Sequence, residues 1–72
     1  MSRPWLRVHV DDRNDVSVIS GPGAGKLVAR AGGRPWWSPA RRAWMSNRRI
    51  ADNVLALADA EGRQVTYTEG PT

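Results

Sequence analysis

A shortage of large apolar side chains is the feature that most restricts how this chain can fold. Its 72 residues include no phenylalanine and no cysteine. A domain of this size buries only about 60 to 65% of its unfolded surface, and without cysteine it has no disulfide or thiolate metal site to stabilise it. The core must therefore use tryptophans and scattered aliphatic residues. We expect a single domain over residues 1–68, with at least two indoles in its core, and a frayed tail over residues 69–72.

Alternation of apolar and polar residues predicts two strands near the start of the chain. In residues 5–10, Leu6, Val8 and Val10 fall on one face. An Asp- and Asn-rich turn follows, and residues 16–20 are apolar enough to form a second strand. The two strands are expected to pair as an antiparallel hairpin.

Two later segments have helical spacing. Residues 24–31 carry a short apolar stripe that ends at paired glycines, which is typical of a short helix. A stronger amphipathic helix follows, for which either Ser46 or Asn47 is a suitable N-cap, and Gly62 ends it. Residues 63–67 are predicted as a last strand.

Three of the four tryptophans lie in one segment around a Ser-Pro dipeptide. Residues 35–37 and 43–45 are predicted as the strands of a hairpin, joined by a type I turn over residues 38–41. The complete order of elements is then ββαββαβ. It predicts an α+β fold in which two helices pack on a small, mostly antiparallel sheet.

The register of this hairpin assigns different roles to its indoles. Trp37 and Trp44 face each other across the two strands, and Trp36 points to the opposite face. Because the core needs bulk, Trp37 and Trp44 are expected to pack under a helix and hold the hairpin. Trp36 is then the candidate for an exposed stacking surface, and the position of Trp5 stays open.

Charge is strongly segregated along the chain, whose net charge is +4. Residues 1–20 balance, residues 21–49 carry seven basic residues and no acid, and residues 50–72 carry one arginine against four acids. Such a positive segment is typical of proteins that bind polyanions. Basic side chains that only keep a small domain soluble are the alternative.

Four arginines lie within nine residues of each other near the start of the main helix. Arg48 and Arg49 are expected in its first turn, where the helix dipole disfavours cations, and Arg41 and Arg42 belong to the preceding turn. This arrangement suits a bound phosphate. The predicted nucleic-acid-binding residues are these four together with Trp36, and with Lys26 and Arg34 at the flank. Arginines that point only into solvent are the alternative.

Other motifs indicate no catalytic chemistry. Residues 20–26 resemble a P-loop, but Ser20 replaces its first glycine and Leu27 its hydroxyl residue, so no nucleoside triphosphatase is expected. A glycine turn without a ligand is favoured there over a phosphate seat beside Lys26. The acidic turn at residues 11–15 lacks calcium-loop spacing, and His9 has no catalytic partner. We expect no enzyme activity, no metal and no cofactor.

The hairpin and the helix after it carry a family resemblance. Trp37, Pro39, Arg42 and Trp44, followed by the apolar face of the main helix, resemble the HARP domain of annealing helicases and its small bacterial and phage relatives. The resemblance covers about residues 16–60. It implies recognition of single-stranded or forked DNA, with Arg42 and its basic neighbours on phosphates. The helicase motor of that family has no counterpart in this chain.

The sequence therefore predicts a non-enzymatic, cytoplasmic nucleic-acid-binding module with no membrane segment. Single-stranded or forked DNA is favoured over RNA and over a specific duplex sequence. The alternative is a small adaptor or inhibitor, of a kind that phages encode, that binds an acidic host protein through the same basic and aromatic surface. A dimer formed through Trp36 or through an open sheet edge is a further hypothesis.

Overall fold

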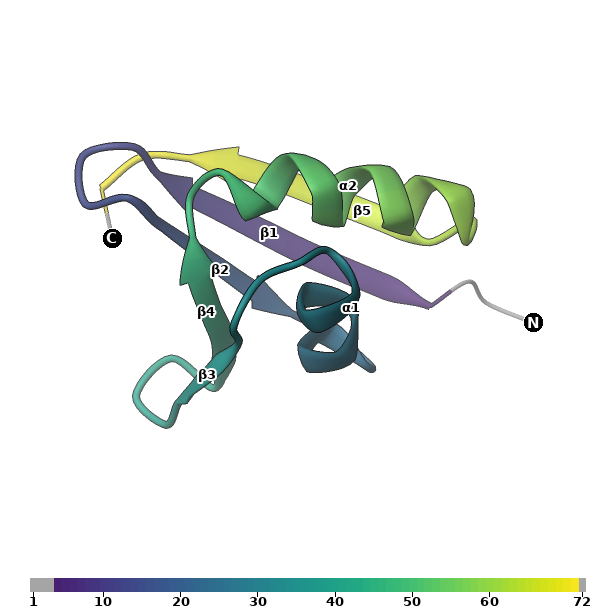
Figure 1. Cartoon of the computed structure of the whole chain (residues 1–72), viewed down its shortest axis with the longest axis horizontal. Coiled ribbons are helices and arrows are strands. Elements are labelled where there is room, and N and C mark those ends of the chain that lie inside the picture. Colours follow the sequence, from purple (N-terminus) through teal and green to yellow (C-terminus); the bar gives the residue numbers. More distant parts are fainter. Residues whose placement is uncertain (1–3, 72) are drawn as a thin grey trace.

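The computed structural model describes residues 4–71 and contains one mixed sheet and two helices. The order of elements is ββαββαβ, which confirms the predicted α+β fold (Figure 1). In chain order they are β1 (Trp5–Asp11), β2 (Val16–Ser20), α1 (Ala24–Arg30), β3 (Trp36–Ser38), β4 (Ala43–Asn47), α2 (Ile50–Ala60) and β5 (Gln64–Glu69).

The five strands lie in the order β3-β4-β2-β1-β5. Three neighbouring pairs are antiparallel, which agrees with the predicted mostly antiparallel sheet, and β5 runs parallel to β1. This parallel pair follows from the chain path, because β4 and β5 point the same way and α2 connects them across β2 and β1. The short strand β3 and the strand β5 are consequently the two edges of the sheet.

Both helices pack on the same face of the sheet, and the core lies between the two layers (Figure 1). Leu6, Val8 and Val10 of β1 all face this core, as their alternation predicted, and each is at most 1% exposed. They meet Val28 of α1 and Val54 of α2, which are fully buried. In residues 4–71, no helix covers the opposite face of the sheet.

One aromatic residue connects the tryptophan-rich hairpin to this core. The indole of Trp44 in β4 packs against α1 at Gly25, where an added Cβ would lie only 2.7 Å from the Trp44 Cε2 atom. Glycine is therefore required at this helical position for space. Close contact with a broad ring is what a small core without phenylalanine needs to fill its volume.

The boundaries of two elements differ from those predicted. Ser46 and Asn47 do not cap α2, because β4 extends through both of them and pairs with β2, and Arg49 occupies the N-cap position. At the C-terminal end, β5 continues to Glu69 rather than ending at residue 67. The N–H of Gly70 also donates to Val10 O at 3.0 Å, so part of the expected frayed tail is bonded to β1.

A small ionic cluster connects the two helices. Glu61, at the end of α2, accepts hydrogen bonds from Arg30 of α1 and from Arg63, and these bonds lower the pKa of the Glu61 carboxyl. Arg63 also donates to the Pro22 carbonyl at 2.6 Å, in the loop that leads into α1. The cluster therefore joins both ends of the α1 region to the C-terminal end of α2.

The contact between α1 and Trp44 predicts an unusual response to alanine. In most helices Gly→Ala stabilises by about 1 kcal/mol, but overpacking a core costs about 1 to 3 kcal/mol. We expect Gly25→Ala to lower the free energy of unfolding by about 1 to 2 kcal/mol, measured by urea denaturation. In a Trp44→Leu background, where the ring is absent, the same change should be neutral or stabilising. If Gly25→Ala alone is more stable than the wild type, Trp44 does not pack closely against Gly25.

Candidate nucleic-acid interface

The β3-β4 hairpin carries most of the predicted binding residues and projects from one edge of the sheet (Figure 1). Its strands pair from Trp36 opposite Met45 to Ser38 opposite Ala43, so residues 39–42 form the connecting loop. This loop begins one residue later than the predicted turn. Arg42 closes it with a φ of 50°, in the left-handed region that arginine adopts only rarely.

The predicted pairing of Trp37 with Trp44 is confirmed, but the predicted burial of Trp37 is wrong. The two rings meet edge to face, with centroids 5.3 Å apart and an interplanar angle of 65°. Trp37 is nevertheless 49% exposed, as much as Trp36 at 46%. The reason is that β3 is an edge strand and the short helix α1 packs against Trp44 of the neighbouring strand. Trp44 alone anchors the hairpin to the core.

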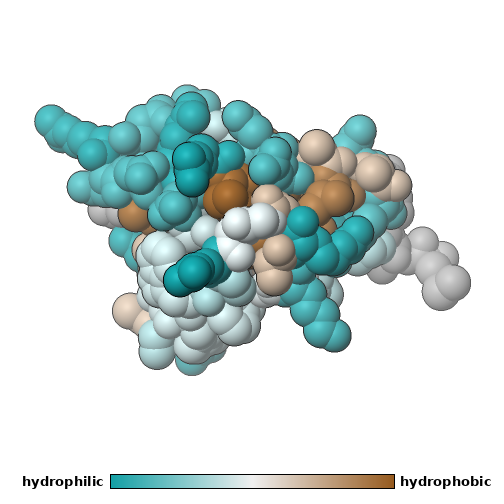
Figure 2. Space-filling view, in the orientation of Figure 1, coloured by the Kyte–Doolittle hydropathy of each residue, from teal (hydrophilic) through white to brown (hydrophobic). Residues whose placement is uncertain are grey.

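The hairpin thus presents two half-exposed indoles on opposite faces of β3. Trp36 shares the uncovered face of the sheet with Met45, its cross-strand neighbour, and Trp37 lies on the helix side beside Trp44. Figure 2 shows the helix side, where pale surface of intermediate hydropathy lies over the hairpin and teal hydrophilic surface with brown hydrophobic patches lies over the rest. A third exposed indole, Trp5, lies on β1 with the Arg7 guanidinium carbon 5.9 Å from its ring centroid.

The four arginines expected around one helix start are separated in the structure. Arg41 and Arg42 are exposed in the hairpin loop, at one end of β4, whereas Arg48 and Arg49 follow its other end. The five residues of β4 span about 16 Å. Arg49 instead lines a groove together with Arg34 and Trp36. The hairpin therefore has an arginine pair at each end of its strands.

Arg48 differs from the other three arginines because it has an acidic partner. Its Nε donates to the Asp12 carboxylate, and this bond raises the pKa of Arg48 above its ordinary value. Arg48 also precedes α2 rather than lying in its first turn, where the acid Asp52 is found. Arg48 is thus held in an ion pair with the β1-β2 turn, and its phosphate contact stays a prediction.

Five basic residues between positions 21 and 49 form no ion pair within the described part of the chain. They are Lys26, Arg34, Arg41, Arg42 and Arg49, and all are exposed. Lys26 lies on α1, which has only seven residues. The glycine loop before α1 is bonded within the chain, through Ala24 N to Gly21 O and through Arg63 to Pro22 O. This agrees with the favoured interpretation of the loop as a turn.

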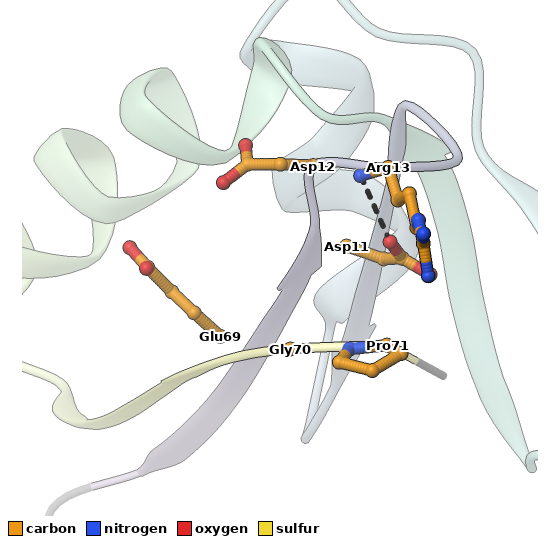
Figure 3. A pocket seen from close by; sticks show the side chains of 6 residues that line it. All are labelled: Asp11, Asp12, Arg13, Glu69, Gly70 and Pro71. Atoms are coloured by element: carbon orange, nitrogen blue, oxygen red, sulfur yellow. Dashed lines mark hydrogen bonds between the residues drawn. The ribbon is translucent and has the colours of Figure 1, made fainter.

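The remaining polar motifs are held by bonds within the chain. Asp11 accepts from the Arg13 and Asn14 backbone N–H groups at 3.0 and 3.2 Å, as expected for a turn (Figure 3). The same turn and the end of β5 border a shallow hollow to which Asp12 and Glu69 contribute carboxylates.

His9 is hydrogen-bonded within the sheet. The Nδ1 and Nε2 atoms of His9 lie 2.7 Å from Thr68 Oγ1 and 3.0 Å from Gly70 O. Its ring therefore bridges β1 to the end of β5, a bond the sequence pattern did not indicate. Residues 4–71 bring no three histidine or carboxylate side chains together as a metal site.

Comparisons with known proteins found no match. No family model, no curated protein and no solved structure is significantly similar to this chain. Neither helix in residues 4–71 has the length and apolar character needed to cross a membrane.

The exposure of the four indoles predicts their accessibility to a charged quencher. Replacing Trp5, Trp36 or Trp37 singly by phenylalanine should lower the fraction of fluorescence that iodide quenches, because each is about half exposed. Trp44→Phe should raise that fraction, because Trp44 packs on α1. Steady-state quenching at matched ionic strength checks this. If Trp37→Phe and Trp44→Phe change the quenched fraction equally, Trp37 and Trp44 are equally accessible and the prediction is contradicted.

Proposed function

We propose that this chain is a non-enzymatic module that binds single-stranded or forked DNA along its β3-β4 edge. The observation that carries the proposal is the arrangement of this edge. Two half-exposed indoles, Trp36 and Trp37, lie between two pairs of arginines that have no acidic partner.

Electrostatics supports a polyanionic ligand. Unpaired guanidinium groups gain more from a phosphate than paired ones, because no intramolecular ion pair has to be broken. The pair Arg41 and Arg42 and the pair Arg34 and Arg49 are separated by about the 16 Å length of β4. A single phosphate cannot reach both pairs. One strand carrying several phosphates can, with its bases over the indoles between them.

The exposed indoles favour unpaired bases over a duplex. Stacking on tryptophan requires a base with a free face, which single strands and fork junctions supply. Neither helix suits the major groove, since α1 has only seven residues and α2 contains no basic residue. The residues that resemble the HARP domain, Trp37, Pro39, Arg42 and Trp44, also belong to this hairpin.

The same surface also suits an acidic protein partner. Tryptophan and arginine are the residues most enriched where protein interfaces concentrate their binding energy. A pull-down from nuclease-treated lysate separates this alternative from the proposal. A stoichiometric protein that remains bound after nuclease treatment, together with no affinity for labelled DNA at low salt, would favour the adaptor function.

The arginines of the hairpin loop should contribute to the salt dependence of binding. Each phosphate contact to a single strand adds about 0.7 to the slope of log K against log salt. We expect Arg41→Gln to lower this slope by about 0.7 in anisotropy titrations with labelled oligothymidylate. Arg13→Gln, an unpaired arginine in the β1-β2 turn, is the matched control and should leave the slope unchanged. Equal slopes for all three proteins would argue against the hairpin.

The exposed tryptophans allow a second test. Trp36→Ala and Trp37→Ala should each weaken binding of a single strand by about 1 to 3 kcal/mol, which is the usual contribution of base stacking. Trp5→Ala removes an equally exposed indole from β1, away from the hairpin, and should have little effect. If Trp5→Ala costs as much as the other two variants, the bases lie elsewhere on the sheet.

A further inference from the structure

A groove lies where β4 meets α2, beside the loop between α1 and β3. Figure 1 shows how these segments come together. The groove contains one buried polar group and two unpaired cations. Its lining residues are Gly32, Gly33, Arg34, Trp36, Ser46, Asn47, Arg49 and Ile50, none of which is acidic. The groove therefore concentrates positive charge in a concave site rather than on a flat surface.

Ser46 forms part of the groove wall and has an unused hydroxyl. The residue is only 1% exposed, yet its Oγ makes no hydrogen bond with any described residue. No fully buried side-chain polar atom in residues 4–71 lacks a partner, so the small accessible surface of Ser46 includes this hydroxyl. Its neighbour across the sheet differs, because Ser17 Oγ donates to the Asn47 carbonyl at 2.9 Å. A nearly enclosed hydroxyl that has no partner in the chain can donate to a ligand that reaches its accessible side.

Glycine keeps the space beside this hydroxyl open. A Cβ at Gly33 would lie 2.8 Å from Ser46 Oγ and 3.0 Å from Ile50 Cγ2. Gly33 is not among the glycines with positive φ, so space rather than backbone conformation favours glycine here. Any larger residue would fill the position next to the unpaired donor.

The start of α2 adds further donors. Arg49 occupies the N-cap position of this eleven-residue helix and supplies no side-chain cap. The Ala51 N–H donates to the Arg48 carbonyl at 3.1 Å, and the N–H groups of Ile50 and Asp52 have no acceptor among the described residues. The positive end of the helix dipole favours an anion there. The two nearby acids, Asp12 and Asp52, interact with Arg48 and raise the pKa of Arg48. Neither acid lines the groove.

We propose that this groove binds a phosphomonoester dianion. Ser46 Oγ and the free N–H groups of Ile50 and Asp52 at the start of α2 donate to its oxygens, and Arg34 and Arg49 balance its two charges. A terminal phosphate has three free oxygens and a charge near −2, which matches two guanidinium groups better than an internal phosphodiester does. Assignment of the group to the end of a DNA strand rests on the proposed function. The phosphomonoester site itself does not.

The test compares DNA strands that differ only in a terminal phosphate. Oligothymidylate with a 5′- or 3′-phosphate should bind the wild-type protein about tenfold more tightly than the same strand with hydroxyl ends, as expected for charge-assisted hydrogen bonds. Ser46→Ala and Arg49→Gln should remove this difference. Ser17→Ala and Arg13→Gln should keep it, and circular dichroism confirms that each variant is folded. Thymidine 5′-monophosphate alone is titrated in parallel.

The strand and thymidine monophosphate titrations distinguish the phosphomonoester site from the proposed function. Equal affinity for phosphorylated and unphosphorylated strands would overturn the phosphomonoester site and leave the proposed function standing. Binding of thymidine monophosphate that Ser46→Ala and Arg49→Gln weaken, without binding of any strand, would support the site with a free phosphomonoester as its ligand, and would overturn the proposed function. Binding of neither probe would overturn both. Because Arg49 is exposed, its variant tests the site even if Ser46→Ala disturbs folding.

Discussion

The packing of Trp44 against Gly25 is the contact on which the hairpin depends. β3 has only three residues and pairs with β4 alone, so its position relative to the core is set through β4. The Trp44 ring supplies that connection, and the absence of a Cβ at Gly25 lets α1 approach it closely. Because Trp44 packs on α1, Trp37 contacts the Trp44 ring in an edge-to-face arrangement and stays half exposed. This core contact therefore keeps Trp44 partly buried and leaves Trp37 accessible.

Ion pairing selects the basic side chains that remain available. Two of the seven basic residues between positions 21 and 49, Arg30 and Arg48, are paired with Glu61 and Asp12, which come from outside that segment. Surface ion pairs of this kind stabilise weakly, but each lowers the positive potential around its own arginine. The unpaired arginines of this segment lie along the hairpin edge and the groove at the start of α2. The proposed phosphate contacts follow this distribution.

Local patterns predicted the elements well where the signal is itself local. The alternation in β1 and the apolar stripes of both helices depend on side-chain period alone, and these elements were found close to their predicted bounds. The errors occur where a distant segment competes for the same residues. Ser46 and Asn47 are good N-caps, but pairing with β2 draws both into β4. Likewise β5 runs past its predicted end because β1 continues beside it as far as Val10 opposite Glu69.

The sequence by itself determined the order of the elements, the facing of Trp37 and Trp44 and the basic character of residues 21–49, because these depend on spacing and composition. Only the tertiary structure decided which indoles are exposed and which arginines are unpaired. Whether Trp37 is buried depends on how far α1 extends over the hairpin. Arg48 pairs with Asp12, 36 positions away, and Arg30 pairs with Glu61, 31 positions away. The unpaired hydroxyl of Ser46 likewise results from Gly33, α2 and β4 meeting at one point, and no local pattern indicates it.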